Sequence, residues 1–290
     1  MKQKITSKSL ILFFFTIFFF SSSAFKTLND YEENLVKEKL SSFDESLKNE
    51  SIKKIIETVG LSFLGTDYVA GTLDDDVNNE KLVIKISGLD CVTFVENTLA
   101  IARTIQTGQP SLESFKDELQ SIRYRNGIID GYTSRLHYFS DWIFDNEQKG
   151  IVKDIAKKIG GVPYKKNINF MSTHSDSYKS LNTDDGESLV KIKNIEKKIN
   201  KRKMYYIPKN EVDTYYDDLQ TGDIIATTTE IKGLDVTHTG YIYKKNGKTY
   251  FLNASLNAKE VIISKEELKE YLNSDKKKTG IMIARPVGVN

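Results

Sequence analysis

The chain has 290 residues, of which 39% are hydrophobic and 28% are charged, and its formal net charge is +2. This length suits one large globular domain that buries a substantial core. The near-neutral charge argues against a nucleic-acid-binding protein, whose surface would carry a strongly basic face.

The N-terminus has the layout of a secretory signal. Lys2, Lys4 and Lys8 precede an apolar stretch at residues 10–20, and the small residues SSSA follow at 21–24. This order predicts a signal peptide over residues 1–24 that is cleaved near Ala24. The apolar stretch is too short to cross a bilayer, which takes about 20 residues. We therefore expect a periplasmic or extracellular protein whose mature chain, residues 25–290, is a single domain without a membrane span and acts as a monomer.

The first half of the mature chain has helical patterns. Apolar residues recur at spacings of three and four between residues 30 and 64, and a turn-rich loop follows at 65–71. A further apolar stripe begins at Val92 and stops before Gly108. Asp90 is a favoured N-cap residue for this helix, so Cys91 is expected in its first turn. Another amphipathic helix is predicted over residues 111–125.

The second half turns from loops to strands. Residues 126–183 are rich in aromatic and turn-forming residues, and the charged segment at about 184–205 predicts a helical insertion. Strands are expected at 223–228, 236–243, 249–254 and 281–286, with a short helix at 264–272. Asn246 and Gly247 join two of these strands in a predicted hairpin. Helices first and strands after them predict an α+β fold.

Cys91 is the only cysteine of the chain. Exported proteins that use cysteine structurally use it in pairs, so a lone thiol is either incidental or reactive. At the start of a helix, free N–H groups and the helix dipole favour a thiolate and predict a lowered thiol pKa. The backbone N–H of Cys91 would also point toward a developing oxyanion. We therefore interpret Cys91 as a nucleophile.

A candidate base and its orienting partner follow in the predicted strands. His238 shares a strand face with Gly240, which leaves space beside the imidazole ring. The hairpin can bring Asn253 beside His238, where the amide oxygen would accept the imidazole N–H and fix the tautomer. Cys91, His238 and Asn253 thus fit the pattern of nucleophile, base and orienter.

The remaining histidines, His137 and His174, lie in turn-rich segments. Each could line a substrate groove, and a surface or structural role is equally open. Three histidines among many carboxylates are also compatible with a zinc amidase. However, no two histidines have a short metal-ligand spacing and no His-Glu-x-x-His helix is present, so we expect neither a metal nor a cofactor.

Several motifs resemble those of NlpC-type cell-wall cysteine hydrolases. DCVTFV at 90–95 is similar to their Asp-Cys-Ser/Thr-x-Phe-Val signature. LGTDYVAG at 64–71 is similar to their Leu-Gly-x-Pro-Tyr-x-x-Gly loop, with Asp67 in place of proline. LQTGDI at 219–224, THTGYI at 237–242 and FLNAS at 251–255 resemble the Leu-x-x-Gly-Asp segment, the histidine strand and the strand after it. Asn253 stands where many members carry histidine.

Three further stretches look like the branch described as N-acetylmuramoyl-L-alanine amidase-like: YRNG at 124–127, GYTSRLHYFSDW at 131–142 and FMSTH at 170–174. The resemblance covers residues 50–288. It implies a papain-like fold in which N-terminal helices, including the nucleophile helix, pack on an antiparallel β-sheet or barrel, with added helical elements. The implied activity is hydrolysis of the amide between N-acetylmuramic acid and L-alanine in soluble peptidoglycan fragments (muropeptides).

The resemblance also implies roles for residues around the nucleophile. Tyr68 corresponds to a tyrosine that adds to the oxyanion hole or orients Cys91. Tyr132, Arg135 and His137 become candidates for the substrate groove. Arg135 suits a carboxylate of the substrate through bidentate contact, and a structural salt bridge is the alternative.

Three other functions remain open from the sequence. The same chemistry could act on another bond, as in an endopeptidase that cuts γ-D-glutamyl-diaminopimelate or in a transpeptidase. A non-catalytic muropeptide-binding domain is a second alternative, although the intact Cys91, His238 and Asn253 count against it. An acyltransferase on the related permuted fold is the weakest, because there the histidine precedes the cysteine.

Overall fold

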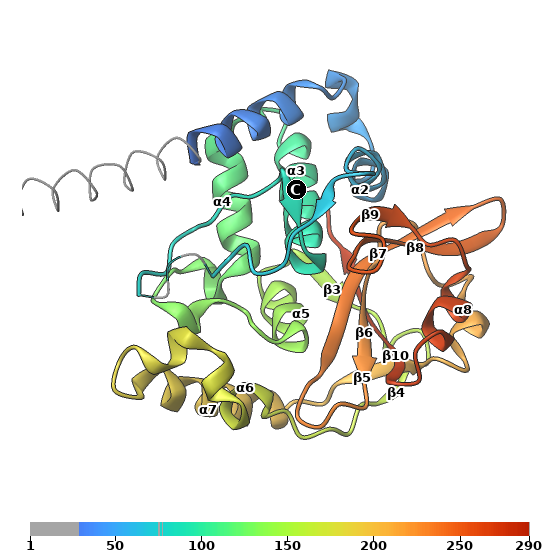
Figure 1. Ribbon diagram of the computed structural model, residues 1–290. Helices are drawn as coiled ribbons and strands as arrows, with labels where there is room; N and C mark the ends of the chain where they lie inside the picture. The colour runs from blue at the N-terminus through green and yellow to red at the C-terminus, as the bar shows by residue number, and fades with distance from the viewer. Residues whose placement is uncertain (1–28, 75, 77, 290) are drawn as a thin grey trace, which may run out of the picture.

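The computed structural model describes residues 29–74, 76 and 78–289, so the predicted signal peptide lies outside the described part of the chain. The fold is α+β, as the order of the sequence patterns predicted (Figure 1). One sheet has the strand order β2-β1-β9-β8-β7-β6-β10-β5-β4, with β3 beside β10. The strands are β1 (Asp67–Tyr68), β2 (Gly88–Leu89), β3 (Val152–Asp154), β4 (Val162–Pro163), β5 (Tyr205–Pro208), β6 (Ile224–Thr229), β7 (Val236–Lys245), β8 (Lys248–Ser255), β9 (Glu260–Ile263) and β10 (Lys278–Pro286).

Helices lie on both sides of this sheet. Figure 1 shows α2 to α5 on one side and α8 on the other, while α6 and α7 lie together beyond α5. Residues 29–41 form a helix that precedes them. The α-helices are α2 (Ile52–Leu61), α3 (Cys91–Gln106), α4 (Leu112–Arg123), α5 (Phe139–Gln148), α6 (Phe170–Thr173), α7 (Glu187–Asn200) and α8 (Leu268–Asn273).

The central strands bury both of their faces. Side chains alternate between the two faces of a strand, so neighbouring residues enter different cores. The core between the sheet and α2 to α5 contains Ile224, Ala226, Tyr241, Leu252, Met282 and Ala284. The core under α8 contains Ile225, Ile242, Phe251, Ile281 and Ile283 together with Leu268 and Leu272. The sheet is therefore a middle layer, and the site residues at its margin stand on rigid backbone.

The predicted hairpin is present and sets the register of β7 and β8. Lys245 pairs with Lys248 across the two-residue turn, and the ladder continues to Tyr241 and Leu252. Asn246 and Gly247 both have positive φ, of 53° and 76°. This is the backbone that Asn-Gly favours in tight hairpins.

Helix α3 is buried far more completely than an amphipathic stripe predicts. Nearly all of its apolar residues are buried, and so are the polar residues Thr93, Glu96, Asn97, Thr98 and Thr104. Glu96 is 2% exposed and pairs with Arg123, 1% exposed, with 2.6 Å between Oε2 and Nε. Such a pair is tolerated in a core because the opposite charge and hydrogen bonds offset desolvation. Helix α3 is thus a central helix of the fold.

Tyr241 attaches α3 to the middle of the sheet. Its ring meets Phe94 of α3 edge-on, with 5.8 Å between the ring centroids. Its buried hydroxyl donates a hydrogen bond to the carbonyl of Val95 at 2.8 Å. Because Tyr241 lies three residues after His238 and Phe94 three residues after Cys91, this contact also fixes the relative position of those two side chains.

Helix α5 is missing from the sequence-based prediction, which gave turns over residues 126–183. Its N-cap residue, Tyr138, makes no side-chain capping bond. The first turn is instead capped from the residue before β7, because the Ser140 N–H donates to the Asp235 carboxylate at 2.8 Å. A helix whose cap is 95 residues away in the sequence carries no local start signal.

Helix α7 falls within the segment predicted as an insertion at about 184–205. Its buried residues Ile192 and Ile199 join a small third cluster with Tyr138, Ile168 and Met171. Glu196 of α7 accepts a hydrogen bond from the Tyr138 hydroxyl at 2.8 Å. The helix therefore has its own apolar contacts, beside α6 and away from the sheet. Across the described residues, no helix is both long and apolar enough to span a membrane.

Replacing Tyr241 with Phe should lower the stability of the protein. The variant keeps the ring packing and removes the hydroxyl from a buried carbonyl, which costs about 1 kcal/mol. Tyr243→Phe on the same strand is the matched control and should stay within about 0.5 kcal/mol of the parent, because its partly buried hydroxyl has no hydrogen bond within the described structure. Urea unfolding monitored by circular dichroism measures both, and equal losses would contradict the role given to Tyr241.

Candidate active site

Cys91 is the first residue of α3, as predicted. The side chain of Asp90 accepts a hydrogen bond from the Thr93 N–H at 2.8 Å, and the Thr93 hydroxyl oxygen accepts one from the Asp90 N–H at 2.9 Å. This capping box fixes the start of the helix. It leaves the N–H groups of Cys91 and Val92 without partners inside the helix. The first turn therefore presents both a sulfur and free backbone donors.

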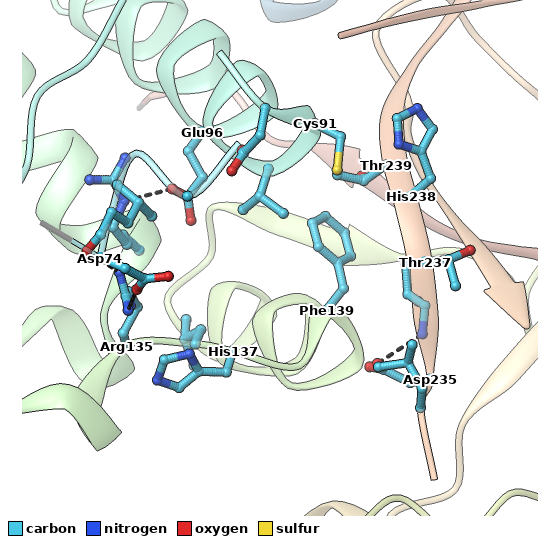
Figure 2. A pocket seen from close by; sticks show the side chains of 18 of the residues that line it. Asp74, Cys91, Glu96, Arg135, His137, Phe139, Asp235, Thr237, His238 and Thr239 are labelled. Carbon is cyan, nitrogen blue, oxygen red and sulfur yellow. Dashed lines mark hydrogen bonds and ion pairs between the residues drawn. The ribbon is translucent and has the colours of Figure 1, made fainter. Parts of the chain in front are cut away.

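Cys91 and His238 line the same cavity, which has a volume of about 270 Å³. Figure 2 shows the sulfur of Cys91 directed toward the imidazole of His238, the first from α3 and the second from β7. Cys91 is a free cysteine of intermediate exposure. A nucleophile and a base that meet in an open cavity are the arrangement that acyl transfer requires.

The thiol pKa does not behave as the helix position alone predicted. Burial, and then the negative charge of Asp90, raise the pKa of Cys91 to about 12. The backbone N–H groups of Thr239, Cys91 and Val92 oppose this shift without cancelling it. The expectation of a lowered pKa was therefore wrong, because desolvation outweighs the helix dipole. The thiol is neutral at rest and needs a base to activate it.

His238 can act as that base because its tautomer is fixed. Its Nε2 lies 2.9 Å from Oδ1 of Asn253. The Asn253 amide nitrogen donates to the carbonyl of Phe251 at 3.2 Å, which assigns the other amide atom as the accepting oxygen. Nε2 must then carry the hydrogen, and Nδ1 is left with a free lone pair. Burial lowers the pKa of His238, so the imidazole stays neutral and its Nδ1 lone pair is available to accept a proton.

Two backbone features aim His238 into the cavity. The pairing of β6 and β7 shifts beside His238, where Thr227 pairs with His238 but Thr228 pairs with Val236, so Thr237 is an extra residue. Such a bulge bends a strand and redirects its side chains. A Cβ on Gly240 would lie 2.5 Å from the carbonyl oxygen of Leu252. Glycine at that position therefore permits the close approach of the two strands that carry His238 and Asn253.

Tyr68 lies beside the nucleophile, on the short strand β1 that pairs with β2 just before Asp90. Burial, and then the charges of Cys91 and Asp90, raise the pKa of Tyr68 to about 12. The hydroxyl consequently keeps its proton and remains a donor. Tyr68 is not among the residues that line the cavity.

Three of the four predicted groove residues line the cavity: Tyr132, Arg135 and His137. Arg135 binds Asp74 at 2.6 Å and the carbonyl of Leu73 at 2.8 Å, so the structural salt bridge is present. His174 lies elsewhere. It is exposed, and its ring stacks on Phe170 with 4.1 Å between the ring centroids.

The sequence reading missed the residues behind His238. Phe251 meets the imidazole edge-on at 5.6 Å, and Tyr271 of α8 packs on Phe251 at 4.9 Å. The Lys278 Nζ lies 3.6 Å from the centre of the Tyr271 ring. Its positive charge contributes to the lowered pKa of His238. No local signal in the sequence links these residues, because α8 and β10 reach His238 only through the folded sheet.

The described residues contain no group of three His, Cys, Asp or Glu side chains placed to hold a metal ion. The carboxylates that line the cavity are also engaged already: Asp74 with Arg135, Asp90 in the capping box, Glu96 with Arg123 and Asp235 with backbone N–H groups. The cavity therefore offers a thiol and an imidazole as its reactive groups.

Comparison with known proteins identifies the family. Residues 58–281 match the AmiA-like family, described as N-acetylmuramoyl-L-alanine amidase-like. The chain belongs to this family. A comparison with curated proteins gives no match.

Solved structures support the assignment. An N-acetylmuramoyl-L-alanine amidase from Bacteroides uniformis ATCC 8492 is 37% identical with a TM-score of 0.77, over 81% of this chain and 98% of that one. A Bacteroides fragilis protein, described provisionally as a xylanase, is 39% identical with a TM-score of 0.74, over 79% of this chain and 99% of that one. A Legionella pneumophila protein at 23% identity, with a TM-score of 0.66 over 92% of this chain and 99% of that one, shares the fold.

Removing the orienting amide should slow catalysis more than it weakens binding. Asn253→Ala deletes the acceptor for the Nε2 hydrogen of His238, so the imidazole loses its fixed tautomer. We expect kcat to fall by about 100-fold, with little change in KM. Asn253→Asp keeps an acceptor and adds a charge that favours imidazolium, so the acid limb of its pH profile should move to higher pH. Steady-state kinetics of both variants test this, and an unchanged kcat in Asn253→Ala would exclude the orienting role.

The pH dependence should depend on Lys278. A histidine that acts as the base must be neutral, and the pKa of His238 lies below its usual value of 6.5, so kcat/KM should fall only in more acidic solution. Lys278→Met removes a nearby positive charge that disfavours imidazolium. The pKa of His238 then rises and the acid limb of the kcat/KM profile moves to higher pH. Asn253 and Asp90, which also raise this pKa, are the same in both proteins.

The control is Lys276→Met, which removes an exposed charge on the same segment. It should leave the limb in place. Profiles of kcat/KM for the three proteins, measured at matched ionic strength, check the assignment. Identical limbs in all three would refute it.

Proposed function

We propose that this chain is a cysteine hydrolase of the papain-like, NlpC type that cleaves the amide between N-acetylmuramic acid and L-alanine in muropeptides. The observation that carries the proposal is the sulfur of Cys91, at the capped start of α3, directed at an imidazole whose other nitrogen is held by Asn253 (Figure 2). Membership of an amidase-like family supports the choice of bond. The predicted export to the periplasm or the cell exterior belongs to the same proposal.

The reaction begins from a neutral thiol and a neutral imidazole. His238 Nδ1 takes the thiol proton as the sulfur attacks the carbonyl carbon of the amide. The carbonyl π electrons move to oxygen, and the resulting oxyanion accepts a hydrogen bond from the Cys91 N–H, while Tyr68, outside the cavity lining, orients Cys91. A preorganised donor of this kind contributes about 3–4 kcal/mol to lowering such a barrier.

The tetrahedral intermediate then collapses toward a thioester. The imidazolium gives its proton to the leaving nitrogen of L-alanine as the C–N bond breaks. Water, deprotonated by His238, attacks the thioester, the C–S bond breaks, and the departing thiolate takes the proton back from the imidazolium. The products are a free muramic carboxyl group and a peptide with a free amino terminus. Asn253 holds the same imidazole tautomer through both half-reactions.

A glycoside hydrolase is a less suitable function for this cavity. That chemistry takes two carboxyl groups across the scissile bond, one of them a general acid and the other a base or nucleophile. Here Asp74 and Glu96 are paired with arginines. Asp235 accepts hydrogen bonds from the backbone of Ser140 and Val236. The unpaired reactive groups are the thiol and the imidazole.

Incubating the mature protein with a muropeptide digest, followed by mass spectrometry, tests the proposal. We expect free sugar and free stem peptide as separate products. Cys91→Ala should abolish their formation, with a loss of at least about 1,000-fold, because no second nucleophile replaces the sulfur. Thr173→Ala, an exposed change on α6 away from the cavity, is a control that should keep full activity.

Other product masses would identify the rival functions. Cleavage between D-glutamate and diaminopimelate would leave the sugar on a shortened peptide and indicate the endopeptidase. Binding without any cleavage by the parent protein would indicate a muropeptide-binding domain. Undiminished sugar release by Cys91→Ala would disprove the cysteine mechanism.

A further inference from the structure

The second histidine of the cavity has a fixed protonation pattern. His137 Nε2 lies 2.8 Å from the backbone carbonyl oxygen of Tyr132. A carbonyl only accepts hydrogen bonds, so Nε2 carries the hydrogen and Nδ1 carries a lone pair. Nδ1 has no hydrogen-bond partner in the part of the chain that the structure describes. His137 therefore holds one unused acceptor.

The surroundings keep His137 neutral. Burial, and then the positive charge of Arg135, lower the pKa of His137 to about 3, with Arg125 adding to the shift. Charging the ring would put a cation in a desolvated position beside two guanidinium groups. His137 accordingly remains an acceptor at any pH at which the protein works, and it does not compete with His238 as a base.

The ring is also held rigidly. It packs on Tyr132 with 4.3 Å between the ring centroids. The Arg135 guanidinium lies 5.0 Å from the centre of the same Tyr132 ring. Arg135 is itself tied to Asp74 and to the carbonyl of Leu73. A binding group placed by such contacts loses little entropy when a ligand arrives.

His137 belongs to the same cavity as the catalytic pair but lies away from it. Figure 2 shows His137 across the cavity from Cys91 and His238, with Phe139 between them. It is therefore placed to contact a part of the substrate next to the scissile bond and not the reacting atoms. A bound group that buried Nδ1 without donating to it would leave a buried acceptor unpaired.

We propose that His137 Nδ1 accepts a hydrogen bond from an N–H or O–H group of the bound muropeptide and thereby selects substrates that carry a donor at that point. This inference rests on the proposed function. The donor has two sources, an amide N–H of the stem peptide or a polar hydrogen of the muramic sugar. Substrates that present an acceptor or an apolar group at that point should be rejected, because His137 cannot switch to a donor there.

Three substitutions separate the two nitrogens of the ring. Asn places an amide oxygen near the position of Nδ1 and lacks the atom that bonds Tyr132. Gln places its amide near the position of Nε2 and offers nothing at Nδ1. Phe keeps the ring shape and removes both polar atoms. If Nδ1 accepts a hydrogen bond from the substrate, His137→Gln and His137→Phe should lower kcat/KM by about 5- to 100-fold. The kcat/KM of His137→Asn should then lie much closer to that of the parent protein.

Kinetics on a defined N-acetylmuramoyl-peptide, with melting temperatures to confirm folding, provide the test. The acid limb of kcat/KM should stay in place in all three variants, since the ring is neutral. A folded His137→Asn variant as impaired as His137→Phe, or a limb that moves, would overturn the proposal. Cys91→Ala and Cys91→Ala/His137→Phe give a second readout, because calorimetry with the same compound should show about 5- to 100-fold weaker binding in the double variant.

A lactyl-peptide that lacks the sugar ring distinguishes the two donor sources. If the penalty of His137→Phe persists with this substrate, the donor is a stem-peptide amide; if the penalty disappears, the donor is on the sugar. Failure of the proposed function is recognised separately. In that case the parent protein would release no stem peptide with a free L-alanine amino terminus from either compound, whatever residue occupies position 137.

Discussion

The contact between Tyr241 and α3 is the constraint on which the site depends. Phe94 and the carbonyl of Val95 meet Tyr241 in the middle of the sheet, so the start of α3 can lie only beside the start of β7. Cys91 lies three residues before Phe94, and His238 lies three residues before Tyr241. The contact between Phe94 and Tyr241 therefore also fixes the relative position of Cys91 and His238. Because interiors are close-packed, a shift of one element would require the other to move as well.

In the proposed mechanism, catalytic power comes from the positioning of the two side chains more than from an intrinsically acidic thiol. Desolvation and Asp90 keep the Cys91 thiol protonated, and desolvation with Lys278 keeps His238 neutral. The raised pKa of Cys91 and the lowered pKa of His238 both favour the neutral forms, so the pair carries no charge before substrate binds. Asp90 illustrates the compromise. Its carboxylate caps the helix that presents Cys91 and at the same time opposes ionisation of the sulfur.

The cavity divides into two ends with different chemistry. At one end lie Cys91 and His238, and at the other His137 is bonded to Tyr132, whose ring faces the Arg135 guanidinium. The carboxylates that line the cavity are paired with arginines or hydrogen-bonded to the backbone, so none of them is a free charge. Recognition of substrate at a fixed distance from the reacting atoms is what orients an amide for attack.

The sequence by itself determined the elements whose signals are local. The N-cap at Asp90, the hairpin turn at Asn246 and Gly247 and the α+β order were all predictable, and so were Cys91, His238 and Asn253 as candidates, because caps, turns and strand alternation are short-range effects. Only the tertiary structure decided the thiol pKa, the bulge at Thr237, the capping of α5 by Asp235 and the place of Lys278 behind His238. Each of these depends on desolvation or on contact between residues distant in the chain, and neither is encoded in a local pattern.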